Sequence, residues 1–567
     1  MTSKRTGSFL LLLLVVTFGL PFVSAQQVSQ GAGAPPAFSQ TNSSMIEVKD
    51  NTPYALAASS LVGPTNPNAV LDIVVGLKWQ NEQQLDEQLA GIQDPNSPEY
   101  RHFLTFEEFV SRFAPSQEDV DGVTRYLESE GLVVMQAASN RKLVHVRGTV
   151  SQIKQAFQVN INDYDFNGTR HFSNDRDPSL PSHIGPAVES IFGLSSFEVF
   201  HPSSHAQRMD SLPTTQLTYT PAQIATAYNF PNLNNAFHGN TTYDGTGVTI
   251  AIATAYAYTA SDLDYFLQYY KIPRTGGVGI ISINGGSTTP NYETTLDVQN
   301  VAAEATGADI FVYETPDSSF ANFVLMYNQM ASDNLAQVVS TSWVVCEANG
   351  GSFVKTADAI FKHLASEGMA MFVGSGDNGA YACSSTSKTL AVDFPSSDPY
   401  FTAVGGTNLY LKTNGTYSNE TAWTGSGGGI SSSFSKPTWQ NGPGVPTNTK
   451  RDLADVSFDA SANTRFYTYY QGVWHDGYGT SFGGPNWAAL WALAIQARSG
   501  KRTGNAGPAV YKIGRNASNY KLDFFDVTTG NNGNGNGPGY NAKKNWDYPT
   551  GWGSPNGTNL VNYVKAH

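Results

Sequence analysis

The sequence predicts an α/β protein, in which a parallel β-sheet is covered by helices on both faces and is preceded by a smaller α+β domain. Two observations predict this fold. Between about residues 247 and 377, short apolar segments alternate with amphipathic segments of helix length. Before residue 200, two helical segments are mixed with short strand-like segments. The chain has 567 residues, too many for one ordinary domain.

The N-terminus has the parts of a secretory signal peptide. Lys4 and Arg5 precede an apolar run over residues 9–18, and Val23-Ser24-Ala25 forms a small-x-small cleavage site. A membrane anchor is the alternative, but a span needs about 20 apolar residues and this run is shorter. We therefore expect residues 1–25 to be a signal peptide and the protein to be extracellular, without a membrane anchor.

A polar leader, residues 26 to about 50, precedes the first domain. Within that domain a helix is predicted from Ser116, its N-cap, with Asp119 in the capping-box position. A strand over residues 142–149 leads into a second helix over 149–159. These elements predict an α+β sandwich.

Residues 201–215, HPSSHAQRMDSLPTT, are polar and contain prolines, so we expect an exposed linker between the two domains. After the linker the apolar segments are short enough to be strands, and the segments between them have helical periodicity. The predicted strands lie at 247–254, 279–284, 308–314, 337–343 and 369–377, and the predicted helices at 260–270, 293–305, 320–332 and 353–366.

The composition excludes one class of partner and indicates an environment. The formal net charge is −13 and the pI about 5.2, so nucleic acid is not an expected partner. Charged residues make up 14% of the chain, against a usual figure of about 25%. Acid denaturation comes mostly from protonating carboxylates that a fold needs ionised, so this composition suits a protein that works in acid. The two cysteines, Cys346 and Cys383, can form one disulfide after secretion or remain two buried thiols.

A candidate nucleophile lies in GYGTSFGGP, residues 477–485, where Ser481 is flanked by glycines and followed by a helix-like run. A serine hydroxyl needs a base. The G-x-S-x-G elbow requires a histidine after the serine, and His567, the last residue, is the one that follows. The subtilisin order requires a histidine early in the second domain. The second domain has three other histidines, His238, His363 and His475. None of them has the Asp-His framework of a subtilisin-like triad, although a histidine base stays an alternative.

A carboxylate base is the third possibility. Glu293 and Asp297 are four residues apart at the start of a predicted helix, so they share one face. A solvated acidic first turn is the alternative, which the helix dipole would favour. The residues that follow are small or apolar, which favours a buried helix instead. Asp377 ends a strand in a Gly-rich turn, where parallel-sheet enzymes keep their sites, although turn aspartates are common.

The segments ETTLD, SGDNG and GTSFGGP, in this order, resemble the sedolisins, subtilisin-fold serine-carboxyl peptidases that include kumamolisin and tripeptidyl-peptidase I. The resemblance covers nearly the whole chain and implies a ferredoxin-like activation pro-domain before a subtilisin-like domain. It implies a pro-domain with leader and linker over residues 26–205 and a peptidase domain over 206–567.

The resemblance implies that Ser481 is the nucleophile and Glu293 its general base. It implies that Asp297 hydrogen-bonds and orients Glu293, and that Asp377 is a neutral oxyanion donor. Thr254 stands where some family members have a glutamate, so the acid network is expected to end at Asp297. Such groups favour acid pH, because Asp377 has to be protonated and the reference pKa of Glu is about 4.3.

The resemblance also implies one structural Ca²⁺ near the C-terminus. Its expected ligands are the carboxylates of Asp526 and Asp547 and the carbonyls of Val527, Lys543 and Asn545, and oxygen ligands suit Ca²⁺. Lys543 and Asn545 stand where family members often have glycines. A Gly/Asn-rich loop without metal is the alternative.

The expected function is therefore a secreted, acid-acting endopeptidase, a monomer that cleaves protein and peptide substrates and is inhibited by its own pro-domain until the linker is cut. A tripeptidyl exopeptidase of the same family is the first alternative. A silent homologue that only binds is the second, and it predicts the loss of at least one catalytic group.

Overall fold

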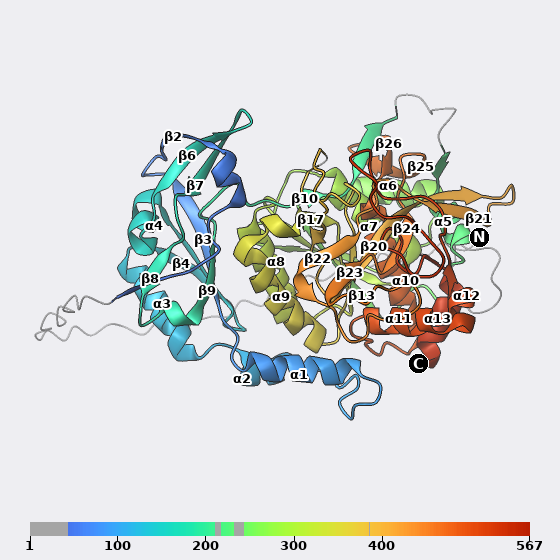
Figure 1. The fold of residues 1–567 in the computed structure, drawn as a ribbon, viewed down its shortest axis with the longest axis horizontal. Coiled ribbons are helices and arrows are strands. Elements are labelled where there is room, and N and C mark those ends of the chain that lie inside the picture. Colours follow the sequence, from blue (N-terminus) through green and yellow to red (C-terminus); the bar gives the residue numbers. More distant parts are fainter. Residues whose placement is uncertain (1–43, 210–216, 232–242, 385) are drawn as a thin grey trace, which may run out of the picture. The chain divides into compact units, whose positions relative to one another are not determined.

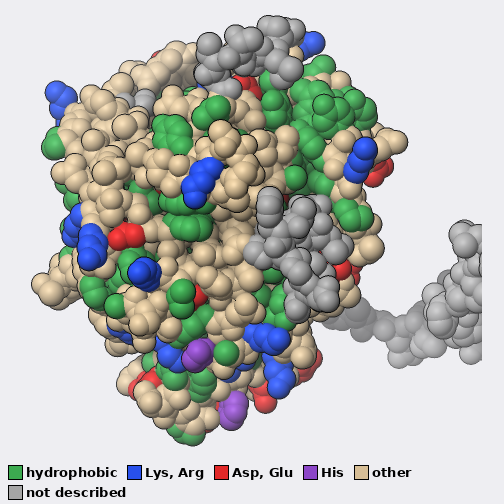
Figure 2. All heavy atoms as spheres, turned by 90° about the vertical axis from the view of Figure 1, so that its right-hand side faces the viewer, with side chains coloured by type: hydrophobic (Ala, Val, Ile, Leu, Met, Phe, Trp, Pro, Cys, Tyr) green, Lys and Arg blue, Asp and Glu red, His purple; other side chains and the backbone are tan. Residues whose placement is uncertain are grey.

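The structure, a computed structural model, describes residues 44–209, 217–231, 243–384 and 386–567 (Figure 1). The expected signal peptide lies outside these residues. Within them, no helix has the length and apolar character needed to cross a bilayer. Figure 2 shows a face on which Lys, Arg, Asp and Glu side chains are scattered among uncharged ones, as expected from the low charged fraction.

A parallel sheet forms the centre of the second domain and confirms the predicted fold class. Its strands lie in the order β14-β15-β13-β16-β18-β20-β21, and β24 also pairs with β20. Neighbours run parallel except β20 and β21. The strands are Val278–Ser282 (β14), Asp309–Thr315 (β15), Thr249–Ala255 (β13), Val338–Thr341 (β16), Ala370–Gly374 (β18), Phe401–Leu411 (β20), Tyr417–Ala422 (β21) and Val456–Asp459 (β24).

Helices cover both faces of this sheet because successive strand residues point to opposite sides and both sides are apolar. Ile252 belongs to the core beneath α7 and α10, and its neighbour Ala253 to the core beneath α8 and α9. The helices of this domain are Pro221–Ala227 (α5), Ala260–Tyr270 (α6), Tyr292–Glu304 (α7), Phe320–Asp333 (α8), Gly351–Ser366 (α9), Gly483–Ala497 (α10), Gly507–Arg515 (α11), Ala517–Asp523 (α12) and Gly557–Ala566 (α13).

The first domain is built in the order β3–α3–β4–β5–α4–β9, the ferredoxin-like arrangement. Its antiparallel sheet has the order β4-β5-β3-β9, and α3 and α4 pack on one face of it. The two predicted helices and the strand between them are confirmed, with slightly shorter bounds. The elements are Val70–Leu77 (β3), Gln117–Ser129 (α3), Val133–Ala137 (β4), Leu143–Thr149 (β5), Val150–Phe157 (α4) and Val188–Phe192 (β9).

Several elements of the first domain were not predicted from its sequence. Two helices, Glu82–Gln93 (α1) and Phe106–Phe113 (α2), follow β3. The capping box of Thr105 and Glu108 at the start of α2 was an available signal. Part of the leader, expected to be loose, forms a strand, Met45–Glu47 (β1), paired with β8. The remaining strands are Ser60–Pro64 (β2), Ile161–Phe166 (β6), Thr169–Asn174 (β7) and Ser179–Pro181 (β8).

The second face of the first domain's sheet packs on α8 and α9. Trp79 donates its indole N–H to the carbonyl of Ala359 at 2.7 Å. The ring of Phe109 stacks on that of His363, with ring centroids 3.6 Å apart, and both rings are fully buried. Apolar burial on this scale attaches the first domain firmly to the second.

Residues 201–208 are exposed, as expected of a linker, except for the buried Ser203 and the half-buried Ser204, but they also form two strands that were not predicted. Residues 210–215 of the predicted linker lie outside the described residues. His201–Pro202 (β10) pairs with Trp343–Cys346 (β17), and His205–Arg208 (β11) pairs with Val473–Tyr478 (β26), both antiparallel. Ser203, between them, is 2% exposed. The segment is polar and mostly exposed, so backbone pairing rather than apolar burial holds it in place. The remaining strands of the second domain are Leu217–Tyr219 (β12), Asp393–Phe394 (β19), Gly429–Ser435 (β22), Lys450–Leu453 (β23), Thr464–Tyr470 (β25), Phe524–Phe525 (β27) and Ser554–Pro555 (β28).

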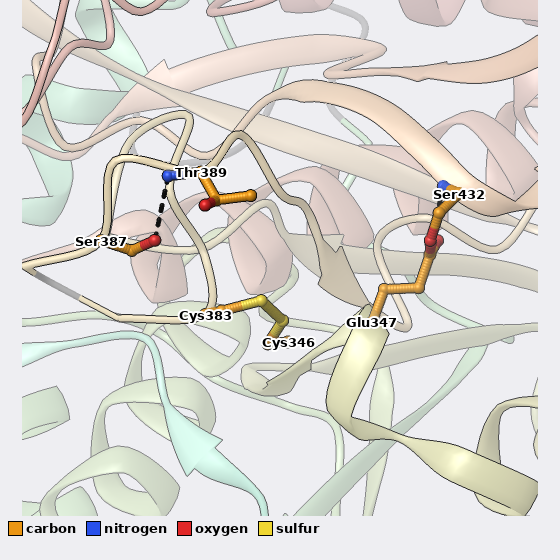
Figure 3. Close-up of a disulfide and its surroundings, with 6 residues drawn as sticks. All are labelled: Cys346, Glu347, Cys383, Ser387, Thr389 and Ser432. Atoms are coloured by element: carbon orange, nitrogen blue, oxygen red, sulfur yellow. Dashed lines mark hydrogen bonds between the residues drawn. A yellow bond between two sulfur atoms is a disulfide. The ribbon is translucent and has the colours of Figure 1, made fainter. Parts of the chain in front are cut away.

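Cys346 and Cys383 are joined by a disulfide, with their Cα atoms 4.8 Å apart (Figure 3). Next to it, Glu347 accepts hydrogen bonds from the backbone N–H of Ser432 at 2.7 Å and of Ser433 at 3.0 Å. These contacts fix β22 beside the end of β17, the strand on which β10 lies.

We predict that Phe109→Ala weakens attachment of the first domain. A buried Phe→Ala change typically costs about 3–5 kcal/mol. In a Ser481→Ala background, which keeps the chain intact, the change should lower Tm and speed limited proteolysis of the first domain at neutral pH. Val133→Ala, on a side chain that is 62% exposed, is the control. Equal Tm and proteolysis for Phe109→Ala and its parent would contradict the account.

Candidate active site

Ser481 lies where β26 leads into α10, in a short 3-10 turn over Thr480–Phe482. Gly479 before the turn has φ 133°, a conformation that favours glycine. A methyl group there would lie 2.4 Å from the Ser203 carbonyl oxygen and 2.5 Å from Asp377 Oδ2. Ser481 is fully buried, and its hydroxyl has no hydrogen-bond partner among the described residues. The glycine therefore leaves room for a chain and an acid to reach the serine.

Glu293 and Asp297 occupy the first two turns of α7, on one face of the helix. Asn291 caps the helix by accepting from the Glu293 N–H at 2.8 Å. Glu293 is 1% exposed and Asp297 is fully buried. The alternative of a solvated acidic first turn is therefore wrong, as the small and apolar residues after the pair indicated.

Burial raises the pKa of both carboxyl groups. The negative charge of Glu293 raises the pKa of Asp297 further, and the hydroxyl of Ser342, which donates to Asp297 Oδ1 at 2.7 Å, opposes the rise. Glu293 Oε1 and Asp297 Oδ2 are both buried without a donor. One proton held between these groups would relieve both the repulsion and the missing hydrogen bond, so the pair is suited to titrate as a unit.

Asp377 follows β18 in the turn that the sequence predicted. Its Oδ1 accepts from the N–H of Thr480 at 2.8 Å and from the Thr480 hydroxyl at 2.9 Å. Its Oδ2 is buried without a hydrogen-bond donor. Burial raises the pKa of Asp377 well above its ordinary value, Thr480 opposes the rise, and Glu293 and Asp393 add to it. Since Oδ1 is already an acceptor, a proton on Asp377 belongs on Oδ2, the oxygen near the Ser203 carbonyl.

The linker contacts this site directly. Ser204 donates its hydroxyl to Glu293 Oε2, and the Ser481 N–H donates to the Ser203 carbonyl at 3.0 Å. The Ser481 hydroxyl is close enough to lower the pKa of Glu293, but it is not in hydrogen-bond geometry. Sequence analysis missed Ser204 and Ser342. Ser342 lies at the end of a predicted strand, where site residues gather, but a single sequence gives no signal for Ser204.

The three described histidines that were weighed as a base have other contacts. His363 is stacked on Phe109 in the contact between the domains, and His475 faces Tyr292 and Tyr470. His567 stacks on Tyr563 at the C-terminus. His238 lies outside the described residues. His205 of the linker stacks on Tyr478 and has its Nε2 3.6 Å from Asp377 Oδ2. The group that interacts with the Ser481 hydroxyl is the carboxyl group of Glu293.

Thr254 ends the acid network with neutral groups, as expected. It accepts from the indole N–H of Trp343 at 2.9 Å and shares a hydrogen bond of 2.9 Å with the Thr294 hydroxyl. These contacts satisfy Thr254 without a further carboxyl group beside Asp297.

The C-terminal loop brings Asp526 and Asp547 together. The N–H of Asn545 donates to Asp526 at 3.2 Å and that of Lys543 to Asp547 at 2.9 Å. Asp526 Oδ1 is buried without a donor, and no described Lys or Arg forms an ion pair with either carboxylate. The described residues hold no cluster of three or more His, Cys, Asp or Glu suited to a metal, so backbone oxygens would have to supply most ligands.

Comparisons with known proteins agree with this geometry. Residues 57–197 match the family model "Pro-kumamolisin, activation domain", and residues 277–553 match "Subtilase family". The chain is 32% identical to sedolisin of Pseudomonas sp. over 87% of each chain, and 25% identical to tripeptidyl-peptidase 1 of Mus musculus over 87% of this chain and 92% of the other.

A solved structure of Pseudomonas sedolisin, a serine-carboxyl proteinase complexed with two molecules of pseudo-iodotyrostatin, is 32% identical in sequence. It covers 62% of this chain and 99% of its own, with a TM-score of 0.56. The chain therefore belongs to the sedolisin family of serine peptidases and carries a pro-kumamolisin activation domain before its peptidase domain.

Proposed function

We propose that the protein is a secreted, acid-acting serine-carboxyl endopeptidase that is made as a self-activating zymogen. Ser481 is the nucleophile, Glu293 the general base, Asp297 the group that orients Glu293, and Asp377 the oxyanion donor. One observation carries the proposal. The Ser481 N–H and Asp377 Oδ2 both lie near the carbonyl of Ser203, and Glu293 accepts a hydrogen bond from the next residue, Ser204. A silent binding homologue is disfavoured because all four groups are present and buried together.

The reaction follows from this arrangement. Ser481 Oγ attacks the substrate carbonyl carbon while Glu293 takes the hydroxyl proton. The oxyanion receives hydrogen bonds from the Ser481 N–H and from protonated Asp377, and one such donor is typically worth about 3–4 kcal/mol. The proton on Glu293 then passes to the leaving amine, and water hydrolyses the acyl-enzyme by the reverse proton path.

Acid pH follows from the opposite needs of the carboxyl groups. Glu293 acts as a base only when it can accept a proton, and Asp377 donates only when it carries one. Burial raises the pKa of Asp377, so its donor is present at low pH and is lost as pH rises through that raised value. Alkaline loss of activity is the consequence.

Endopeptidase action is supported by how the linker occupies the cleft. The chain enters along β17, with the Phe200 N–H bonded to the Ser318 carbonyl at 2.8 Å, and leaves along β26. The cleft thus accepts residues well before the carbonyl held by Ser481, whereas an enzyme that releases tripeptides has to close that end. The first domain occupies the cleft through this segment, which supports its role as an intramolecular inhibitor.

Calcium is proposed for the C-terminal loop. The residues fit a hard cation because the buried Asp547 and the half-buried Asp526 lie together, neither within ion-pair distance of a described Lys or Arg, and one Asp526 oxygen lacks a donor. Asp526 and Asp547 would hold Ca²⁺ with the carbonyls of Val527, Lys543 and Asn545. The ion would neutralise the loop and stabilise the fold, with no part in bond cleavage.

We predict that Ser481→Ala and Glu293→Gln each abolish proteolysis and self-processing at acid pH. Loss of a nucleophile or its base removes most of the rate. Purified precursors are acidified to about pH 4, and processing is followed by gel and peptide cleavage by fluorescence. His475→Gln serves as the control and should process like the wild type. Normal processing by Glu293→Gln would return the search to a histidine base.

We predict that Asp377→Ala lowers kcat of the mature enzyme by about 10²–10³, the usual loss for one oxyanion donor. Asp377→Asn should lose less, because its Oδ1 can still accept from Thr480 while its NH₂ donates at every pH. Its activity should therefore persist to higher pH than that of the wild type. The pH profile of kcat/KM measures this, and an unchanged alkaline limb would exclude Asp377 as the titrating donor.

We predict that EGTA lowers Tm of the mature enzyme and that Ca²⁺, but not Mg²⁺, restores it. Calcium at about 100 times its dissociation constant would stabilise the fold by about 2.7 kcal/mol. Asp547→Ala should have a lower Tm that no longer responds to EGTA. A wild type whose Tm is indifferent to EGTA would show that the loop folds without metal.

A further inference from the structure

The linker lies along the active-site residues and is held by strand pairing on both sides of them. Upstream of the site, β10 pairs with β17 and the Ser203 N–H donates to the Ser342 carbonyl at 3.0 Å. Downstream, β11 pairs with β26, His205 opposite Tyr478 and Arg208 opposite His475. Two strands thus hold the chain on either side of one peptide unit, which joins Ser203 to Ser204.

The groups around that peptide unit are those of the reaction. The Ser203 carbonyl accepts from the amide of the nucleophile itself, Ser481, at 3.0 Å. Any Cβ at Gly479 would lie within 2.5 Å of both that carbonyl oxygen and Asp377 Oδ2, so the two oxygens lie on either side of one small space. On the other side of the bond, the Ser204 hydroxyl donates to Glu293.

The register is fixed by side chains as well as by backbone. A shift of one residue that placed Pro202 at Ser481 would put a proline, which has no N–H, opposite the Ser342 carbonyl. The opposite shift would move His205 off the ring of Tyr478, on which it now stacks with centroids 4.7 Å apart. That shift would also break the hydrogen bond of 3.2 Å that Arg465 donates to the Gln207 side chain. Arg465 is held in place by its ion pair with Asp476.

We propose that Ser203–Ser204 is the bond the precursor cleaves in itself, and that the Ser204 hydroxyl keeps the precursor inactive by occupying Glu293. This inference rests on the proposed function. It adds the scissile bond and the residue that delays its cleavage. The latch is local, because the hydroxyl that occupies the base is on the first residue after the bond and leaves with the new N-terminus.

Cleavage of this bond needs no reactant other than water. The Ser204 hydroxyl turns away from Glu293, and Glu293 accepts the proton of Ser481 Oγ as that oxygen bonds to the Ser203 carbonyl carbon. The C–N bond to Ser204 breaks, and the proton passes to its nitrogen, which becomes the amino terminus. Water then releases Ser203 as the carboxyl terminus of the first domain.

The test uses the full precursor, purified at neutral pH and acidified for short times before mass spectrometry of both products. We expect a fragment that ends at Ser203 and a partner that begins at Ser204 to appear first and together, and neither to appear with Ser481→Ala. If the first two fragments show cleavage at any other bond, the assignment of Ser203–Ser204 is wrong, while the proposed function still holds. Absence of any Ser481-dependent cleavage, in the linker or in an added unfolded protein, overturns both.

The latch has its own test. Ser204→Ala keeps the bond but removes the hydroxyl, and a hydrogen bond to a charged group is commonly worth a factor of ten or more, so we expect processing about tenfold faster. Ser204→Thr keeps the hydroxyl and should process at the wild-type rate. Ser111→Ala, an exposed serine on α2, is the matched control. Equal rates for Ser204→Ala, Ser204→Thr and the wild type overturn the latch.

Discussion

Three carboxyl groups are buried around one serine, and their desolvation governs the rest of the site. In water, Glu293, Asp297 and Asp377 would all be ionised at neutral pH. In the fold, burial is the largest cause that raises the pKa of each. Ser342 donates to Asp297 Oδ1, and Thr480 donates to Asp377 Oδ1. The other oxygen of each carboxyl group is therefore the one available to hold a proton. In the function we propose, such a site would be competent in acid, and the low charge of the whole chain suits the same conditions.

The activation domain uses the same cleft. Its helix α2 attaches to α9 through the buried ring pair of Phe109 and His363, and the chain that leaves the domain pairs first with β17 and then with β26. The pairing that makes the linker an inhibitor also presents it as a substrate. If the proposed latch holds, inhibition depends on the Ser204 hydroxyl and on the protonation of Glu293 as well as on the presence of the linker, and activation would respond to pH without a separate sensor.

Much of this could be predicted from the sequence because its signals are local. Alternating apolar segments gave the strands and helices of the sheet, and the spacing of Glu293 and Asp297 placed both acids on one face of α7. The strand pairing of the linker could not be predicted, because it depends on strands far along the chain and the linker's own residues are polar. For the same reason the contact between Ser204 and Glu293 had no sequence signal. The buried surroundings of His363 come from residues of another domain, so its sequence could not show whether it was structural.

The most direct measurement is a crystal structure of the mature enzyme at acid pH. With the linker gone, the account predicts that Ser481 Oγ moves into hydrogen-bond distance of Glu293, about 2.6–3.2 Å, at the position that Ser204 occupies in the precursor. Asp377 Oδ2 should then face a water or ligand oxygen that also accepts from the Ser481 N–H. A mature site in which Ser481 Oγ is bonded to a histidine, or stays without contact to Glu293, would contradict the account.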